Sequence, residues 1–278
     1  MLIDLHIHTN ESDGTYSPES AVRTAKEYGI KAIAITDHDS IDGIKPAIAE
    51  GKAIGIQVVP GIEINTEYGD VDIHILGYYM DINDKRFLDL LRFLREERIK
   101  RIERFIEKLK AIGFDVELER VLQIAGKGSI GRPHLGRVLM EQGYVGSMRE
   151  AFEKYLDRGS PTYVERHEFP PTKAIEAIRQ ARGIPVIAHP GILKKDDIIP
   201  ELVKDGLMGI EVFHSEHTWR DRQNYMLIAK ETGLLMTGGS DCHGPGGKDR
   251  MRIGTVRVPY VFLERLEEAK ANIDRINY

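Results

Sequence analysis

The sequence predicts an α/β fold with a mainly parallel sheet or a barrel, interrupted by a helical subdomain. Short β-branched runs alternate with amphipathic helical stretches through most of the 278 residues. This alternation stops between about residue 84 and residue 166, where helical patterns follow one another. We therefore expect a barrel domain made of residues 1–83 and 167–278, and a helical insertion made of residues 84–166.

The predicted strands are short segments rich in Ile and Val that end near Gly, Pro or polar residues. They read MLIDLHIH, KAIAITD, IQVVPGIEI, VDIHILGYY, IPVIAHP, MGIEVF, LLMTGGSD and IGTVRV. A helix is predicted between the first two strands. Ser17 is a suitable N-cap for this helix, Pro18 fits its first turn, and Gly29 can end it.

The predicted insertion contains one long helix and two shorter ones. The segment FLDLLRFLREERIKRIERFIEKLKAIG carries apolar residues at helical spacing and stops at Gly113. Its Arg and Lys residues alternate with Glu, which favours an ordinary solvated face. Pro133 marks the start of a second helix, and Ser147 with Glu150 forms a capping box for a third.

The composition is that of an ordinary globular chain, with 41% hydrophobic and 30% charged residues. A formal net charge of -5 argues against a generally basic nucleic-acid-binding surface, so we expect no stable binding to duplex DNA. No stretch approaches the roughly 20 apolar residues of a membrane span. The single cysteine, Cys242, cannot form an internal disulfide and is expected to be buried and inert. We expect a cytoplasmic protein without membrane contact.

Histidines and acids recur near the ends of the predicted strands. Asp4, His6 and His8 alternate along the first strand, so their side chains share one face. A lone His-x-His pair fits core histidines and metal ligands about equally well. However, the same residue types follow at Asp13, Asp37, His38, Glu63, His74, His189, Asp241 and His243. Carboxylates and imidazoles gathered at one edge repel one another or lose solvation unless a cation lies among them, which predicts a divalent metal site.

Some polar residues in these segments have a simpler explanation. We expect Asp4 to orient a neighbouring imidazole or to lie behind the metal ligands, and Asp37 and Asp39 to cap a helix or support a ligand from behind. His167 has no supporting pattern and is expected to be structural or exposed. The sequence leaves the role of His214 open.

These motifs resemble those of the polymerase and histidinol phosphatase (PHP) family, and they occur in family order over nearly the whole chain. The matching segments are Asp-x-His-x-His at Asp4 to His8, Thr-Asp-His at Thr36 to His38, Gly-x-Glu at Gly61 to Glu63, His74, His-Pro at His189, and Ser-Asp-x-His at Ser240 to His243. The resemblance implies a distorted (β/α)7 TIM-like barrel that hydrolyses phosphoesters with a cluster of usually three divalent metals. Mixed His and carboxylate sites accept Mn, Fe or Zn.

The resemblance also assigns the ligands, and every position holds the expected residue type. The ligands are His6, His8, Glu63 and Asp241 for one metal, Asp13, His38 and His243 for a second, and Glu63 with His74 and His189 for a third. This complete set argues against a degenerate, non-catalytic PHP module.

Within the family, the chain is most similar to the branch of nucleoside 3′,5′-bisphosphate phosphatases and 5′-to-3′ exoribonucleases. That branch shares the segment GRPHLGR in the insertion and a histidine, here His217, after GIEV. The resemblance implies that a metal-activated hydroxide hydrolyses a phosphomonoester or phosphodiester of a nucleoside 3′,5′-bisphosphate, a 5′-nucleotide or short RNA. Arg132 and His134 would bind a second phosphate, while His217 would contact phosphate or donate a proton; Arg132 and His217 are the catalytic candidates.

Three alternatives stay open at this point. They are a histidinol-phosphate-type phosphatase, an amidohydrolase-like metal hydrolase, and a metal-binding accessory module without catalysis. The Thr-Asp-His motif at Thr36 to His38 and the Ser-Asp-x-His motif at Ser240 to His243 argue against the amidohydrolase.

Overall fold

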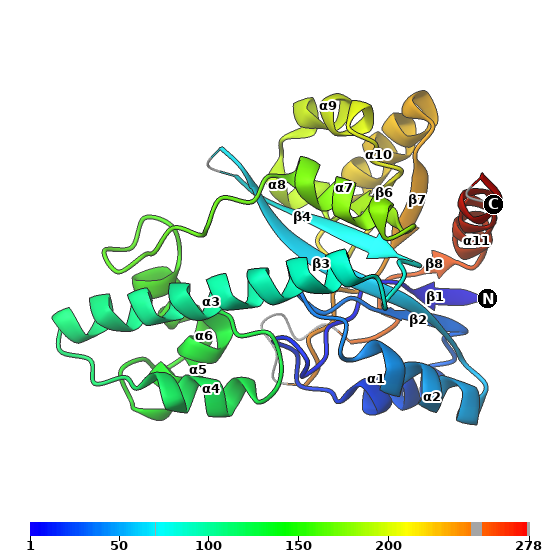
Figure 1. The fold of residues 1–278 in the computed structure, drawn as a ribbon. Helices are drawn as coiled ribbons and strands as arrows, with labels where there is room; N and C mark the ends of the chain where they lie inside the picture. Colours follow the sequence, from blue (N-terminus) through cyan, green and yellow to red (C-terminus); the bar gives the residue numbers. More distant parts are fainter. Residues whose placement is uncertain (70, 246–251, 277–278) are drawn as a thin grey trace.

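One sheet of eight strands organises the computed structural model, which describes residues 1–69, 71–245 and 252–276 (Figure 1). Its strands are β1 (Leu2–Asp4), β2 (Ala32–Ile35), β3 (Gln57–Tyr68), β4 (Val71–Tyr78), β5 (Ile184–Ile187), β6 (Gly209–Phe213), β7 (Leu235–Gly238) and β8 (Val258–Pro259). They are ordered β7-β6-β5-β4-β3-β2-β1-β8. The first seven strands therefore lie side by side in sequence order, as in a barrel.

Strand β4 runs against both of its neighbours, whereas β1 to β3 and β5 to β7 form parallel pairs. Only residues 69 and 70 connect β3 to β4. A parallel neighbour would need a crossover of a dozen residues or so, usually a helix, and this connection is too short for one. The predicted distorted α/β barrel is confirmed, with the short β8 added beside β1.

The sheet closes through backbone hydrogen bonds between the chain that follows β1 and the chain that follows β7. Leu5 N donates to Gly238 O at 3.1 Å, and Asp241 N donates to His6 O at 2.9 Å. A Cβ at position 239 would overlap the backbone nitrogen and the Cβ of His6, so this approach requires Gly239. The closure brings residues from the two ends of the chain to one barrel end.

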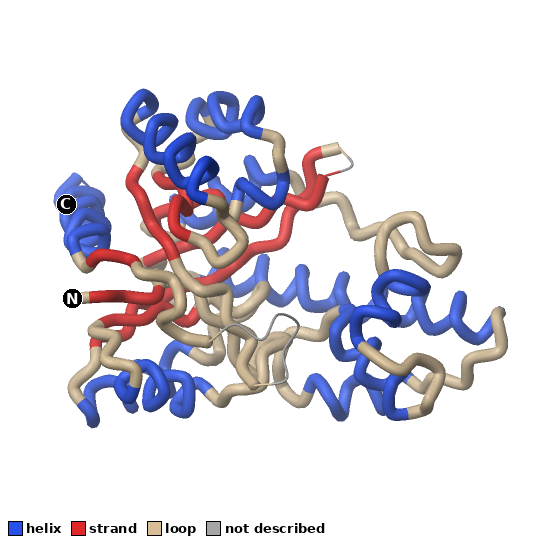
Figure 2. The backbone as a smooth tube through the Cα atoms, turned by 180° about the vertical axis from the view of Figure 1, so that it is seen from behind, coloured by secondary structure: helices blue, strands red, loops and turns tan. Residues whose placement is uncertain are grey.

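Helices cover the outside of the barrel (Figures 1 and 2). They are α1 (Pro18–Glu27), α2 (Ile44–Ile54), α7 (Pro171–Gln180), α8 (Pro190–Leu193), the 3-10 turn η2 (Asp196–Ile198), α9 (Ile199–Lys204), α10 (Trp219–Thr232) and α11 (Val261–Ile276). The predicted start of α1 is confirmed, because the Ser17 side chain accepts a hydrogen bond from Ser20 N. Among the described residues, every helix is too short or too polar to cross a lipid bilayer.

A second group of helices extends to one side of the barrel (Figure 2). It contains α3 (Lys85–Ala111), α4 (Leu118–Ala125), α5 (Arg132–Glu141), α6 (Met148–Ala151) and the π-helical turn η1 (Phe152–Leu156). The first half of α3 buries Phe87 and Leu91 in the barrel core, whereas Phe105 and Leu109 belong to a separate core with α4 and α5. Helix α3 thus contributes to both cores. The division of the chain into a barrel domain of residues 1–83 and 167–278 and a helical insertion of residues 84–166 stays a prediction.

Candidate active site

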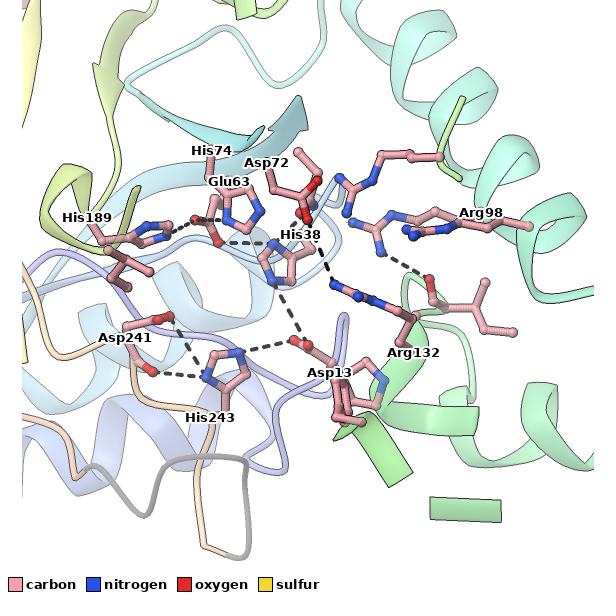
Figure 3. Close-up of a pocket in the computed structure, with 18 of the residues that line it drawn as sticks. Asp13, His38, Glu63, Asp72, His74, Arg98, Arg132, His189, Asp241 and His243 are labelled. Carbon is pink, nitrogen blue, oxygen red and sulfur yellow. Dashed lines mark hydrogen bonds and ion pairs between the residues drawn. The ribbon is translucent and has the colours of Figure 1, made fainter. Parts of the chain in front are cut away.

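The histidines and acids singled out in the sequence meet at the barrel end where the parallel strands terminate. Most of them border a cavity of about 340 Å³ that also reaches the side helices, namely Asp13, His38, Glu63, His74, His189, Asp241 and His243 (Figure 3). The barrel closure places His6 and His8 beside Asp241, and the β3–β4 hairpin places Glu63 close to His74. Residues that are far apart in the sequence thus share one site.

The first group consists of His6, His8, Glu63 and Asp241, whose potential ligand atoms all lie within 4.8 Å of one another. His8 Nε2 lies 3.2 Å from Glu63 Oε2 and 3.0 Å from Asp241 Oδ1. His6 Nε2 lies 3.4 Å from the same two oxygens. Both imidazoles are fully buried, so these nitrogens have no access to bulk water.

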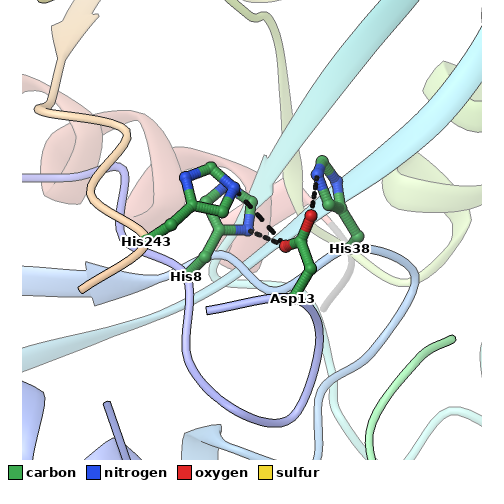
Figure 4. A group of neighbouring side chains, drawn as sticks. All are labelled: His8, Asp13, His38 and His243. Carbon is green, nitrogen blue, oxygen red and sulfur yellow. Dashed lines mark ion pairs between the residues drawn. The ribbon is translucent and has the colours of Figure 1, made fainter. Parts of the chain in front are cut away.

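A second group joins His8 with Asp13, His38 and His243 (Figure 4). Asp13 Oδ1 lies 3.4 Å from His243 Nε2, and Asp13 Oδ2 lies 3.9 Å from His38 Nε2. The loop that carries Asp13 is fixed by Asp37, which accepts hydrogen bonds from Thr9 N at 2.7 Å and from the Ser12 hydroxyl at 2.6 Å.

Glu63 connects this second group to a third. Its Oε1 lies 2.9 Å from His74 Nδ1 and 3.0 Å from His189 Nε2. Its Oε2 lies 3.0 Å from His38 Nδ1. Both oxygens of one buried carboxylate therefore face imidazole nitrogens on several sides, which is the arrangement expected of a bridging ligand.

The donor atoms in these groups fit divalent cations. Several buried atoms have no hydrogen-bond partner among the described residues, namely His6 Nε2, His8 Nδ1 and Nε2, His189 Nδ1, Asp13 Oδ1 and Asp241 Oδ1. An unpaired buried polar atom costs about 1–3 kcal/mol, so such a concentration indicates a bound partner. Imidazole nitrogens and carboxylate oxygens together suit Mn, Fe or Zn.

The carboxylates and imidazoles of the cluster shift one another's pKa values. Burial opposes ionisation of Glu63, yet the surrounding histidines, with His74 the strongest, hold its pKa well below the usual range. Burial also opposes protonation of His8, but the nearby carboxylates of Asp241 and Glu63 raise its pKa to about 10. At His38 burial prevails over the carboxylates of Glu63 and Asp13 and lowers the pKa to about 4. A cation among these groups would satisfy the carboxylates without requiring protonated histidines.

Arginines line the opposite side of the cavity (Figure 3). They are Arg98 and Arg101 of α3, Arg132 at the start of α5, and Arg166. Arg98 Nη2 and Arg166 Nη1 are buried without a hydrogen-bond partner among the described residues. Burial, together with the nearby Arg166 and Arg132, lowers the pKa of Arg101 to about 9. This end of the cavity is therefore a concentrated cationic site with unused donors.

Comparison with known families identifies the cluster. Residues 4–158 match the family model described as PHP domain. The chain belongs to the PHP family. It is 33% identical over 279 aligned positions to the 3′,5′-nucleoside bisphosphate phosphatase of Chromobacterium violaceum, with 98% of each protein covered.

Two further similarities concern enzymes of the same kind. The chain is 32% identical to the 5′-3′ exoribonuclease Rnm of Escherichia coli (strain K12), over 88% of this chain and 86% of that protein. A solved structure from Bifidobacterium adolescentis, described as a metal-dependent phosphoesterase, matches with a TM-score of 0.88 at 29% identity. That match covers 95% of this chain and 94% of the other. This PHP chain is thus a metal-dependent phosphoric ester hydrolase.

Arg132 lines the cavity of this PHP enzyme, and its predicted contact with phosphate stays a prediction. Its Nη1 donates to Leu156 O at 3.1 Å, and its Nη2 lies 3.9 Å from Asp72 Oδ2. Its guanidinium also lies over the Phe152 ring, with its carbon 5.6 Å from the ring centroid. These contacts fix the guanidinium plane toward the cavity.

His134 and His217 occupy different positions from those expected of groups that touch phosphate. His134 is buried and accepts a hydrogen bond from Gly131 N at 3.0 Å, which closes the first turn of α5. Burial lowers its pKa to about 4. His217 Nδ1 donates to Val212 O at 2.9 Å, and its Nε2 accepts from Gly191 N at 3.1 Å. Both nitrogens of His217 are thus engaged with the backbone, and direct substrate contact by either histidine stays a prediction.

The residues given a simpler explanation behave accordingly. Asp4 accepts from Ser240 N at 2.8 Å, just before Asp241, and so supports that ligand from behind. Cys242 is fully buried, and burial raises the pKa of its thiol to about 11. His167 is exposed.

Sequence reasoning missed two parts of the site. The reading of the long helix as a plain solvated face is wrong for Arg101, which is 6% exposed, and for Arg98, which lines the cavity. Glu211 was also missed and the role of His214 was left open, although both are fully buried beside the cluster. The available signal was a single carboxylate within the otherwise apolar strand segment GIEVF.

Proposed function

We propose that the chain hydrolyses a phosphate ester of a nucleotide that carries a second phosphate, either a nucleoside 3′,5′-bisphosphate or the end of a short RNA. One observation carries this proposal. A single cavity has the histidine and carboxylate cluster on one side and arginines with unused donors on the other. A substrate with two phosphates separated by a nucleoside would satisfy both sides together.

We assign three divalent metals, Mn, Fe or Zn, to the histidine and carboxylate side. The ligands would be His6, His8, Glu63 and Asp241 for one, Asp13, His38 and His243 for another, and Glu63, His74 and His189 for the third. When bound, such metals supply a hydroxide at neutral pH and neutralise charge on the phosphoryl oxygens. Glu63 and the buried histidines hold the geometry in which this chemistry takes place.

The arginine side would bind the phosphate that is not cleaved. A guanidinium presents a planar set of donors that matches phosphate oxygens, and Arg98 and Arg166 each have a buried N–H group available. Arg98 is held in place because its Nε donates to Asp39 Oδ2 at 2.6 Å. Arg132 is held by Leu156 O at 3.1 Å. Fixed donors favour binding, since little side-chain freedom is lost when phosphate arrives.

The cavity suits a nucleoside better than a bare phosphate. Apolar side chains also line it, namely Ile102, Ile130, Phe152, Ile192 and Leu193. Pockets for small molecules usually combine such apolar walls with a few fixed polar groups, and occupy about 300–1,000 Å³. The cavity of about 340 Å³ lies within this range.

Hydrolysis of four substrates with added Mn²⁺ tests the proposal, measured as phosphate release from the monoesters and as release of mononucleotides from the RNA. The substrates are a nucleoside 3′,5′-bisphosphate, a 5′-mononucleotide, a short 5′-phosphorylated RNA and histidinol phosphate. We expect the bisphosphate or the RNA to give the highest kcat/KM. Turnover of histidinol phosphate alone would contradict the substrate class, and no product from any substrate would favour an amidohydrolase or an accessory module.

Arg132→Ala tests the second phosphate site. We expect kcat/KM for the bisphosphate to fall by about tenfold to a hundredfold, equivalent to a lost charged hydrogen bond of about 1.5–3 kcal/mol, while the mononucleotide changes little. Arg120→Ala is the matched control, because Arg120 lies on α4 of the same helical group and pairs with Glu141 at the surface. Equal losses on both substrates would remove Arg132 from phosphate recognition.

A further inference from the structure

We infer that Glu211 is a positioning residue that fixes which nitrogen of His6 faces the metal cluster and ties His6 to His189. Glu211 lies in the middle of β6 and is fully buried. Its two oxygens lie 3.1 and 3.2 Å from His6 Nδ1. Its Oε2 also accepts a hydrogen bond from the backbone N–H of His189 at 2.8 Å. One carboxylate therefore contacts ligands from two different parts of the barrel.

The contact with His6 selects one orientation of the ring. An ionised carboxylate can only accept hydrogen bonds, so Nδ1 of His6 must be the donor. Nε2 is then directed at Glu63 and Asp241, each 3.4 Å away, and it has no hydrogen-bond partner among the described residues. A ring reversed by half a turn would lose the Glu211 contact. Glu211 thus keeps Nε2 available as a ligand atom.

The contact with His189 holds an uncommon backbone conformation. His189 has a φ of 30°, in the left-handed region that a residue with a side chain rarely adopts. The hydrogen bond from its N–H to Glu211 stabilises this turn, and the turn directs His189 Nε2 to Glu63 at 3.0 Å. Loss of Glu211 would therefore disturb ligands on both sides of Glu63.

His214 lies beside Asp241 without a hydrogen bond to it. Its Nδ1 accepts from Glu216 N at 3.2 Å, so the ring proton must be on Nε2, which lies 3.6 Å from Asp241 Oδ2. The ligand atoms of His6, Glu211 and His214 also lie close enough to hold an ion themselves. That arrangement would require His6 to use both nitrogens as ligands and His214 to give up its backbone contact. Glu211 and His214 are better explained as a layer behind the metal ligands His6 and Asp241.

The test compares Zn²⁺ binding in wild type, Glu211→Gln and Glu211→Ala, with Glu267→Gln as a control. Glu267 contacts Gln57 and Tyr79 on the outer part of the barrel. The glutamine variant preserves the shape of Glu211 but places an N–H group where an acceptor is needed, so we expect Zn²⁺ affinity to fall by about 10–100-fold. The control should keep wild-type affinity. A Zn²⁺ affinity of the Glu211→Gln variant within twofold of the wild-type value would overturn the inference.

Nitrogen NMR of histidine-labelled, Zn²⁺-loaded wild-type protein gives a second readout that needs no variant to fold. We expect His6 to bind Zn²⁺ through Nε2 and to retain a slowly exchanging proton on Nδ1. Binding through Nδ1, or a Zn²⁺ ion held by Glu211 itself, would overturn the inference. Both readouts measure metal binding, so a negative result would refute the role of Glu211 and leave the proposed substrate class untouched. Inactivity of wild-type protein that holds its metals would refute only the proposed function.

Discussion

Glu63 is the residue on which the candidate site depends most. It is 1% exposed, and its two oxygens face nitrogens of His6, His8, His38 and His74 at distances from 2.9 to 3.4 Å. With His189, which lies 3.0 Å from its Oε1, Glu63 contacts five imidazoles among the described residues, whereas Asp241 contacts four and Asp13 three. We therefore expect its substitution to affect both of the metals assigned to it.

Glu63→Gln keeps the shape of this side chain but removes its charge and one of its two acceptor oxygens. We expect turnover to fall by at least about 10²–10³-fold, the cost of losing one strong stabilising contact in a catalytic site, and the metal content to fall with it. Phosphate release and elemental analysis of the same sample measure both quantities. A Glu63→Gln protein with full metal content and near-normal turnover would show that Glu63 does not bridge.

The sequence predicted that these histidines and acids would gather at one end of the barrel, because strand periodicity and side-chain chemistry are both local. Asp4, His6 and His8 had to share a face, and strand ends in a barrel meet at one rim. It did not predict Arg98 or Arg101, because alternating Arg and Glu on a helix look the same whether the helix faces water or a cavity. Their direction is decided by how α3 packs across the barrel.

At the scale of elements, α3 links the two cores and carries the arginines. Phe105 lies on its distal half, fully buried, with its ring 5.5 Å from the Arg101 guanidinium carbon. The ring also makes an edge contact with Tyr163, with centroids 6.2 Å apart. Packing around Phe105 therefore supports both the helical group and one wall of the cavity.

Phe105→Ala should lower the free energy of unfolding by about 3–5 kcal/mol, because a large buried ring is replaced by a cavity. Urea unfolding followed by circular dichroism measures this change. The exposed Phe93 on the same helix provides the control, since Phe93→Ala removes a ring that is 39% exposed. A loss below about 1 kcal/mol for Phe105→Ala would mean that the second core contributes little to stability.

The barrel closure is a second element-scale feature with a clear test. Gly239→Ala inserts a Cβ into the space taken by the His6 backbone, so the chain after β7 must move away from the chain after β1. We expect a destabilisation of about 1–3 kcal/mol and weaker metal binding, because His6 and Asp241 separate. Thermal unfolding and a Zn²⁺ titration measure the two effects.

Gly233, whose Cβ would meet no atom within 4 Å, offers a control in the same region of the chain. At Gly233 the φ of 72° adds backbone strain, so Gly233→Ala is expected to affect stability but not metal affinity.

At the scale of the whole molecule, the order of strands and helices followed from the sequence, whereas strand direction did not. VDIHILGYY was correctly identified as a strand, but the hydrophobic pattern of a strand is the same in either direction. The antiparallel course of β4 depends on the two-residue connection after β3, which the pattern did not delimit.

Charge is distributed unevenly over the molecule. The chain has a formal net charge of -5, yet the cavity gathers arginines at one side and expected metal ligands at the other. This distribution suits a small anionic substrate that enters the cavity. A cytoplasmic location and the lack of stable duplex DNA binding stay predictions from composition.

Phosphate release before and after removal of metal tests the central claim most directly. Purified protein is treated with a chelator, shown by elemental analysis to be metal-free, and assayed on a nucleoside 3′,5′-bisphosphate before Mn²⁺ is titrated back. We expect no release from the metal-free protein and recovery of full turnover as metal returns to the histidine and carboxylate cluster. Undiminished phosphate release by verified metal-free protein would contradict the account.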